Sequence, residues 1–531
     1  MLPALTALLA CLAIATATAV TKPDPPCSNI PKPHIPGAII LSITSTPLKN
    51  HTVAAAPPIL NTNITVHDIC SVSITLRHPP ANDTVHVQIW LPSPSAWNTR
   101  LISLGGSAWA AGHGPLTLAP YSAQGFAAAS TDAGLDGNLL SPAGWALTPS
   151  GEINTPLLTN FASRSILDMS LAAKQVTASY YRTPASYSYF EGCSTGGRQG
   201  LVAAQKYPGA FDGILAGAPA IYWTKYVVAE LWPQVVMKER GYFPSACEFQ
   251  VVRQKVVEAC DGLDGVKDGV VPDVEGCARR FRAEELVGKR GVCPGGEEVM
   301  LTRELADVVE RIWEGPKKAD GSRLWYGLGV GSPLESLAAT EMVNGTRTGV
   351  PFSVAADWVR YFVKAKGAFD VGAIDSVVLR GIFAESVEKF EEIIDSSNPD
   401  LSAFKRSGGK LMVWHGESDN IIFPQDSVQY RKEVQERLGA GSDIDSFFRL
   451  FMAPGVDHCG LGSIDGAGPT NPLGSLIDWV EKGKAPRELA AATLPTAKSQ
   501  FTRKMCSYPL VAKFDGRGDP AAASTYRCTK N

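Results

Sequence analysis

A marked excess of charge of either sign is missing from this 531-residue chain. It carries 49 Lys and Arg against 52 Asp and Glu, a formal net charge of −3. Without a basic balance or a block of acidic residues, we expect no surface for nucleic acid and no long acidic tail. Beyond the N-terminus, no stretch reaches the roughly 18 continuous apolar residues of a membrane span. We therefore expect neither nucleic acid nor a membrane among its partners.

One apolar run does stand out, at the N-terminus. Residues 5–15 are largely apolar but too few to cross a bilayer, and Ala17-Thr18-Ala19 supplies the small residues that a signal peptidase prefers. This pattern predicts a signal peptide over residues 1–19 and a secreted, extracellular protein. A buried N-terminal helix is the alternative.

Cysteines are few but even in number once Cys11 is removed with the signal peptide, which leaves ten. An even number in a secreted chain predicts five disulfides. Apart from one pair considered below, we expect Cys260–Cys277 and Cys506–Cys528 from proximity, Cys27–Cys70 as the N-terminal pair, and Cys247–Cys293 by elimination.

Four Asn-X-Thr sequons agree with secretion and are candidate glycosylation sites. They lie at Asn50, Asn63, Asn82 and Asn344.

The stretch from Tyr187 to Gly200 contains the pattern Gly192-x-Ser194-x-Gly196. Residues 185–190 are aromatic and β-prone, and residues 201–207 continue a helical pattern as far as a proline. Where a strand turns sharply into a helix, a serine at the bend is exposed, and small flanking residues avoid a clash of the two backbones. Because this short pattern recurs by chance in long chains, Ser194 is a candidate nucleophile that still needs partners.

Candidate partners follow later in the chain. Residues 411–424 indicate a buried strand and a loop that carries Asp419, and His458 lies in a short loop after the apolar run 447–452. A serine hydroxyl needs a base to take its proton, and the base needs a carboxylate to hold its tautomer. The order Ser194, Asp419, His458 is that of α/β-hydrolases.

Two neighbours compete for these roles. Glu417 is the alternative to Asp419, which is preferred because its position well past the strand end leaves it free to turn toward the histidine. His415 follows the strand directly and could simply cap it. Asp457 adjoins His458, but consecutive side chains usually diverge.

Cysteines flank both candidates: Cys193 directly precedes the serine and Cys459 directly follows the histidine. If serine and histidine meet in a triad, a disulfide between these sulfurs would lock the two loops together. The joint pattern Cys-Ser, Asp, His-Cys resembles that of the tannase and feruloyl esterase family of fungi and bacteria, which carries this bridge. Residues 207–220 also resemble that family, and the likeness covers most of the chain.

The resemblance implies an α/β fold, namely an α/β-hydrolase fold with a large inserted lid domain. It also implies a serine carboxylic ester hydrolase that acts on phenolic acid esters through Ser194, His458 and Asp419. As the substrate we expect feruloyl (hydroxycinnamoyl) esters of plant cell wall polysaccharides, with the galloyl esters of a tannase as the alternative. More distant alternatives are a secreted serine peptidase of the same fold and a glycoprotein binding module with a decayed site.

A glycine-rich turn follows the expected strand at residues 100–104. In an α/β-hydrolase such a turn builds half of the oxyanion hole from backbone N–H groups, and the N–H of Thr195 would be the other half. We assign Gly106 as the donor in the turn, against the alternative of a plain surface turn. The family often has three glycines here, so Ser107 is a departure that leaves the donor's identity open.

The expected domains are a first core part over residues 20–222, a lid over residues 223–400 and a second core part over residues 401–531. The lid region differs in its many charges, four cysteines and many glycines. Helices are expected at 302–313 and 386–394. Its aromatic side chains are candidates to hold an aromatic substrate, although each by itself is expected in the lid core: Trp313, Trp325, Tyr326, Trp358, Tyr361 and Phe362.

Within the lid, residues 260–270 form a tight loop with three aspartates among glycines. Converging carboxylates repel each other, and a hard cation such as Ca²⁺ relieves this with oxygen ligands. The spacing is not that of an EF-hand, and a solvated Asp-Gly turn is the alternative. The loop resembles the structural calcium loop of the family, which implies as ligands the side chains of Asp261, Asp264 and Asp268 and the carbonyls of Val266 and Val270.

Overall fold

A mixed sheet of nine strands forms the centre of the protein, which a computed structural model describes over residues 27–439, 441–461 and 465–530. The predicted signal peptide, residues 1–19, lies outside the described residues. The nine strands are β1 (Ile39–Leu48), β4 (Ile69–Arg77), β5 (Val85–Pro92), β6 (Arg100–Leu104), β7 (Ala127–Thr131), β8 (Tyr187–Cys193), β9 (Gly213–Gly217), β14 (Lys410–Gly416) and β15 (Phe448–Ala453).

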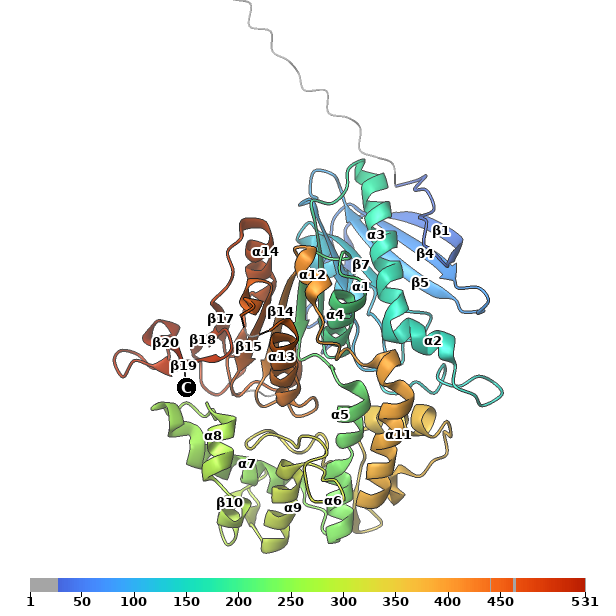
Figure 1. Ribbon diagram of the computed structural model, residues 1–531. Coiled ribbons are helices and arrows are strands. Elements are labelled where there is room, and N and C mark those ends of the chain that lie inside the picture. Colours follow the sequence, from blue (N-terminus) through green and yellow to red (C-terminus); the bar gives the residue numbers. More distant parts are fainter. Residues whose placement is uncertain (1–26, 440, 462–464, 531) are drawn as a thin grey trace, which may run out of the picture.

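The strand order is β1-β4-β5-β7-β6-β8-β9-β14-β15 (Figure 1). The leading strands β1, β4 and β5 are antiparallel to their neighbours. From β7 onward every neighbouring pair is parallel. The carboxyl ends of β8, β14 and β15 therefore meet at one edge of the sheet, where the loops after them can form a site.

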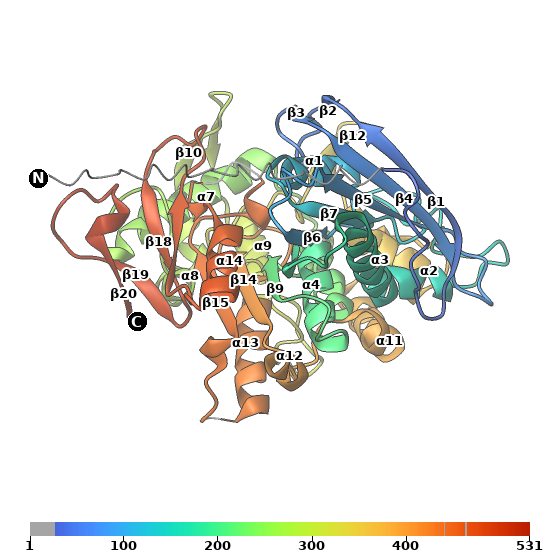
Figure 2. The same cartoon turned by 90° about the horizontal axis from the view of Figure 1, so that it is seen from above.

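Helices cover both faces of the sheet, because the strand side chains alternate between the faces and both sets are apolar. In β6, Leu101 packs into the core on one face and Ile102 into the core on the other. Figure 2 shows the two helical layers from above. One layer is α1 (Pro115–Ala123) and α14 (Pro472–Lys482), and the other is α3 (Ser165–Tyr181), α4 (Thr195–Lys206) and α13 (Pro424–Leu438).

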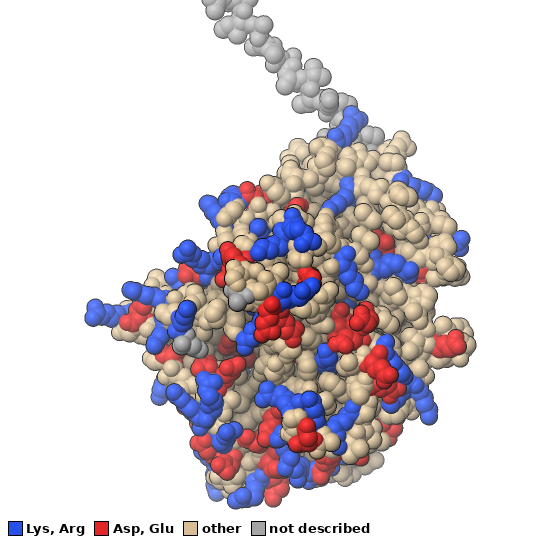
Figure 3. Space-filling view, in the orientation of Figure 1, with Lys and Arg blue, Asp and Glu red and all other residues tan. Residues whose placement is uncertain are grey.

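The chain between Gly217 and Lys410 contributes no strand to this sheet in its described residues, although β9 and β14 are direct neighbours. This segment forms the part of the molecule below the sheet in Figure 1, where Figure 3 shows side chains of both signs interspersed. Its helices between residues 223 and 400 are α5 (Trp223–Ala229), α6 (Trp232–Arg240), α7 (Ala246–Cys260), α8 (Val274–Arg280), α9 (Arg303–Glu314), α10 (Ser353–Asp357) and α11 (Ser376–Ile394), and its hairpins are β10 (Arg290–Val292) with β11 (Glu298–Met300) and β12 (Thr340–Val343) with β13 (Thr346–Gly349).

Short elements complete the chain. Strands β17 (Glu488–Ala492) and β18 (Thr502–Cys506) pair in antiparallel fashion after α14, and β19 (Leu510–Phe514) pairs with β20 (Tyr526–Lys530) near the C-terminus. The other short elements are α2 (Thr155–Thr159), α12 (Ser402–Arg406), β2 (His51–Val53), β3 (Ile64–Val66) and β16 (Gly468–Pro469).

Helix α3 begins at Ser165, directly after a π-helical turn at Asn160–Arg164. Helix α11 begins at Ser376, ten residues before the expected start, because the Asp375 side chain accepts the N–H of Val378 and caps the helix there. Within the described ranges, no helix is both long and apolar enough to cross a membrane.

The five disulfides of the structure are the five predicted pairs. They are Cys27–Cys70, Cys193–Cys459, Cys247–Cys293, Cys260–Cys277 and Cys506–Cys528.

Candidate active site

Ser194 lies at the bend between β8 and α4, where the sequence placed it. Its φ of 63° and ψ of −123° are a backbone conformation that non-glycine residues rarely adopt. Close backbone approaches on both sides require glycine. A Cβ on Gly192 would come within 2.6 Å of the Gly196 carbonyl carbon, and a Cβ on Gly196 within 2.8 Å of the Gly106 oxygen. The strained, tightly packed turn presents the serine at the carboxyl edge of the sheet.

Asp419 and His458 meet at the same edge. His458 Nδ1 lies 2.8 Å from Asp419 Oδ2, which leaves Nε2 as the nitrogen that can serve Ser194. Asp419 Oδ1 accepts the N–H groups of Ile421 and Ile422, each at 2.9 Å. The aspartate is fully buried, so these bonds fix its position in the loop after β14.

His415 is a further partner of the acid. Its Nε2 lies 3.0 Å from Asp419 Oδ2, and its Nδ1 lies 2.8 Å from the Ser427 hydroxyl. The sequence placed His415 next to the candidate triad but did not reveal this contact. Glu417, the alternative acid, lines a different, small cavity, together with Asp264, Asp268 and Arg503.

The pKa values of Asp419 and His458 are both shifted from their ordinary values. Burial alone would raise the pKa of Asp419, but His458 and His415 outweigh it and hold that pKa well below the usual range. Burial alone would lower the pKa of His458, but the Asp419 carboxylate outweighs it and raises that pKa. Asp419 is therefore ionised throughout the neutral range, and it favours the imidazolium form of His458.

A pH profile should reflect this balance. If His458 is the base, only its neutral form accepts a proton, so kcat/KM should fall as pH drops through the raised His458 pKa. The acidic limb should thus have its midpoint above 6.5, the ordinary histidine value. Initial ester hydrolysis rates measured from pH 4 to 9 provide the check. A limb centred at or below 6.5 would contradict it.

The Cys193–Cys459 disulfide joins the two loops of the site. The two Cα atoms lie 6.1 Å apart, and the bond links positions 266 residues apart in the chain. Because each cysteine is the direct neighbour of Ser194 or His458, the bridge limits how far the serine and histidine loops can separate.

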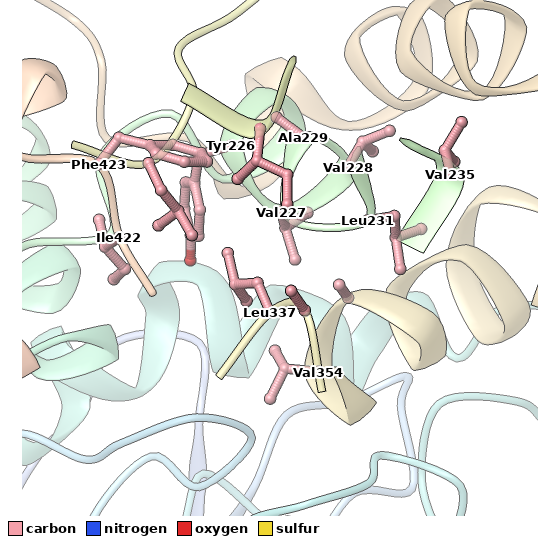
Figure 4. Close-up of a cluster of buried hydrophobic side chains, with 14 of the residues drawn as sticks. Tyr226, Val227, Val228, Ala229, Leu231, Val235, Leu337, Val354, Ile422 and Phe423 are labelled. Atoms are coloured by element: carbon pink, nitrogen blue, oxygen red, sulfur yellow. The ribbon is translucent and has the colours of Figure 1, made fainter. Parts of the chain in front are cut away.

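A cavity of about 380 Å³ opens over this edge of the sheet, between the core and the segment 223–400. Ser194, His458 and Cys459 lie in its wall. Figure 4 shows Tyr226 and Ile422 among the packed side chains where α5 meets the loop after β14. The remaining wall of the cavity is largely apolar and aromatic, and it includes Trp223, Tyr226, Phe352, Val354, Trp414, Ile421 and Ile422. A cavity of this size and lining suits a small aromatic ligand.

The six aromatic residues expected to hold a substrate are not among the residues that line this cavity. Trp358 and Phe362 are fully buried and stack on each other, with ring centroids 5.0 Å apart. The expectation that each belongs to the lid core agrees with these contacts. Trp223, Tyr226 and Phe352 supply aromatic surface instead, and no spacing signal in the sequence distinguished them.

The expected oxyanion donors have different surroundings. Thr195 is the first residue of α4 and, like Ser107, lies in the cavity wall. The Gly106 N–H instead donates to Gln199 Oε1 at 2.9 Å, so the donor that we assigned to Gly106 is engaged elsewhere. Ser107, the next residue of the turn, is the adjacent candidate. The sequence could not reveal this difference because Gln199 reaches the turn from α4.

The predicted calcium loop lies after α7. Asp261 accepts the N–H groups of Asp268 and Gly269, and Asp268 also forms an ion pair with Arg503. Burial raises the pKa of Asp264 and Asp268, and repulsion between neighbouring aspartates adds to the shift of each. In the described part of the chain, no three His, Cys, Asp or Glu side chains are grouped closely enough to hold a metal ion. Val266 and Val270 are buried.

Two buried carboxyl groups in the cavity wall were missed from the sequence. Glu191 lies on β8, and Glu230 directly follows α5. Burial raises the pKa of Glu191 to about 7. The available signal was an acidic residue inside an apolar run, as in Val-Val-Ala-Glu230-Leu-Trp. The four candidate glycosylation sites, Asn50, Asn63, Asn82 and Asn344, are all exposed.

Comparison with known proteins places these features in context. A family model described as tannase and feruloyl esterase matches residues 70–529. A probable feruloyl esterase of Arthroderma benhamiae is 46% identical over 507 residues, which cover 95% of this chain and 94% of that protein.

Two solved structures match as well. Tannin acyl hydrolase from Aspergillus niger has a TM-score of 0.84 at 25% identity and covers 94% of this chain and 92% of its own. Feruloyl esterase B from Aspergillus oryzae has a TM-score of 0.77 at 27% identity and covers 93% of this chain and 97% of its own. The predicted α/β-hydrolase fold is confirmed.

Proposed function

Because this chain belongs to the tannase and feruloyl esterase family, we propose that it is a secreted serine esterase that hydrolyses hydroxycinnamoyl esters of plant cell wall polysaccharides. It is a carboxylic ester hydrolase of the phenolic ester class. The observation that carries the proposal is the contact of Asp419 with His458, whose loop is joined to the Ser194 loop by the Cys193–Cys459 disulfide at a largely apolar cavity. The 46% identical relative named a probable feruloyl esterase favours hydroxycinnamoyl over galloyl esters.

The mechanism follows from the geometry. His458 Nε2 takes the proton of Ser194 as the serine oxygen attacks the ester carbonyl carbon. The Thr195 N–H and a donor from the turn at Ser107 stabilise the oxyanion. The alcohol leaves with the proton from His458, and an acyl-serine remains. Water then attacks this ester, with His458 as base, and releases the phenolic acid.

The substrate class is tested by initial hydrolysis rates for methyl ferulate, methyl caffeate and methyl gallate. We expect turnover of both cinnamates and little turnover of gallate. A preference for gallate would make the enzyme a tannase with the same proposed triad. Cleavage of blocked peptide amides without hydrolysis of any of the three esters would favour a peptidase and contradict the proposal.

Removing the bridge between the two loops should impair catalysis more than folding. In a Cys193→Ala/Cys459→Ala double variant we expect kcat to fall about 100-fold, because looseness of about one ångström between reacting groups has that effect. The matched control is Cys506→Ala/Cys528→Ala, which removes a bridge of similar Cα separation, 5.6 Å, outside the cavity wall. Unchanged kcat in the first variant would contradict a preorganising role.

We also propose that Asp261, Asp264 and Asp268 hold a structural Ca²⁺ with the carbonyls of Val266 and Val270. The donors fit this ion in kind, since all five would be oxygen ligands and a cation would relieve the repulsion among the three carboxylates. Binding would have to draw these carboxylates closer together than they lie in this structure. In this role the ion stabilises the loop and takes no part in the ester chemistry.

Calcium removal should therefore lower the thermal stability. With chelator we expect Tm to drop by about 2–3 °C, the shift for a chain of this length when a ligand present at about 100 times its Kd is removed. Differential scanning calorimetry with and without Ca²⁺ measures the shift, and atomic emission measures the bound metal. Asp264→Asn should abolish the response, whereas Asp320→Asn in an exposed turn should retain it. An unchanged Tm together with metal-free protein would contradict the proposal.

Secretion is supported by the disulfides, by the expected signal peptide and by the exposed sequons. Five disulfides suit an oxidising compartment.

A further inference from the structure

Glu230 is a buried carboxyl group in the wall of the cavity that Ser194 and His458 also line. It follows α5 directly and is 1% exposed. Its Oε2 atom is buried and has no hydrogen-bond partner among the described residues. Leaving such an atom unpaired costs about 1–3 kcal/mol, so a carboxyl group in this position calls for an explanation.

The charge state of Glu230 follows from its surroundings. Burial raises its pKa well above the usual range, and the nearby carboxyl groups of Asp419 and Asp426 add to this shift. The shift favours the neutral carboxylic acid, which can donate one hydrogen bond and accept another. A neutral acid in a largely apolar wall is suited to a neutral hydroxyl group rather than to a cation.

The proposed triad does not account for Glu230. Asp419 is already satisfied: Oδ2 contacts His458 and His415, and Oδ1 accepts two backbone N–H groups. No hydrogen bond from Glu230 to this group is present among the described residues. Glu230 is thus an unused polar group on the lid side of the cavity.

Two other acidic residues, Asp426 and Glu191, differ from Glu230 in their position. Asp426 also has unpartnered carboxyl oxygens, but it is not among the residues that line the cavity. Glu191 lines the cavity and its Oε2 is also unpartnered, but it lies on β8, the strand that leads to Ser194, and bonds to the Tyr121 hydroxyl. Glu230 combines an unpaired atom with a position in the segment after β9, away from the nucleophile's own strand.

Around Glu230 the lid side of the wall is apolar and aromatic. Trp223 and Tyr226 precede it on α5, and Phe352 and Val354 come from the chain before and within α10. Such a wall takes up an aromatic ring by burial of its faces, but it supplies no specificity for a ring substituent. A polar group within the wall does supply such specificity, because a substrate that offers no hydrogen bond leaves the polar group unpaired.

We propose that Glu230 is the hydrogen-bond partner of a ring hydroxyl on the phenolic acyl group and so selects hydroxylated over unsubstituted aromatic esters. This inference rests on the proposed function, since it requires the acyl arm to occupy the cavity. The carboxylic acid pairs with the phenolic hydroxyl when the substrate binds, and the bond persists in the transition state. Substrates without the hydroxyl lose this bond but keep the contact of the ring with the apolar wall.

The test compares kcat/KM for methyl 4-hydroxycinnamate and methyl cinnamate in wild type and three variants. Glu230→Met removes the polar group at similar length, and Glu230→Gln keeps one donor and one acceptor. Asp426→Leu is the matched control, because it removes a buried, unpartnered carboxyl group outside the cavity wall.

We expect wild type to prefer the hydroxylated ester about 10- to 100-fold, and Glu230→Met to reduce that preference to within about threefold. Glu230→Gln and Asp426→Leu should retain it. The Met variant should fold, since replacing an unpaired buried polar atom by an apolar group is nearly neutral or stabilising. Should it fail to fold, methyl 4-methoxycinnamate with wild type gives a second measurement: this ester cannot donate from its ring oxygen, so its rate should fall toward that of the unsubstituted ester.

An equal loss on both esters in Glu230→Met would overturn the inference, since it would mean that Glu230 acts through the triad or the fold. An unchanged preference in that variant, or no preference in wild type, would overturn it too. Failure of wild type to hydrolyse either ester would instead contradict the proposed function itself, which separates the two failures.

Discussion

Ser194→Ala is expected to lower kcat for methyl ferulate by about 10⁵- to 10⁶-fold. The substitution removes the atom that would form the acyl intermediate, and the methyl group left in its place offers His458 no proton to take. The remaining rate would come from the oxyanion donors and from substrate binding, which sustain about 10³- to 10⁴-fold catalysis over water in serine hydrolases. Because alanine and serine both carry a Cβ, the substitution adds no backbone strain at the φ of 63°.

The measurement is steady-state hydrolysis together with labelling by a fluorophosphonate, which marks only an activated serine. Ser170→Ala is the matched control, because Ser170 is buried in α3 and is not among the cavity-lining residues. The control should be labelled at the wild-type rate. Appreciable turnover or labelling of Ser194→Ala would mean that another residue is the nucleophile.

Asp419→Asn should have the second largest effect, a loss of about 10⁴-fold in kcat. The amide keeps the shape of the side chain but presents no negative charge to His458, so the wrong imidazole tautomer is favoured and the imidazolium is no longer stabilised. The raised pKa of His458 depends on Asp419. The acidic limb of the pH profile should therefore move to lower pH in any residual activity.

Glu417→Gln is the control that decides between the two candidate acids. Burial raises the pKa of Glu417 to about 8, and Asp273 and Glu275 add to the shift, so this group is largely neutral near pH 7. It lines the small cavity beside Asp268. We expect its amide variant to remain within a few-fold of wild type. A severe loss in Glu417→Gln with little change in Asp419→Asn would reverse the assignment.

The features that could be predicted were those encoded in short stretches. The bend at Ser194, the strand before Asp419 and the strand before His458 each lie within a few residues, and the flanking cysteines join them into one pattern. The strand expected at residues 100–104 likewise coincides with β6.

Features that depend on side chains meeting across the fold could not be predicted. Gln199 engages the Gly106 N–H from 93 residues away, and His415 reaches Asp419 only because the loop after β14 turns back. For the same reason, the sequence did not indicate that Trp223, Tyr226 and Phe352 line the cavity. The sequence shows which aromatic residues the segment 223–400 contains. Only the packing decides whether a ring such as that of Trp358 faces the core or the cavity.

The disulfide between the serine and histidine loops also changes the topology of the covalent chain. Residues 193–459 close into a ring, and the whole segment between β9 and β14 lies within that ring. A single cut in this segment would not divide the enzyme into two molecules, because both ends of the sheet would stay joined at the serine and histidine loops. The segment that lines one side of the cavity can thus be nicked, lengthened or exchanged while one covalent link still joins the loop of Ser194 to the loop of His458.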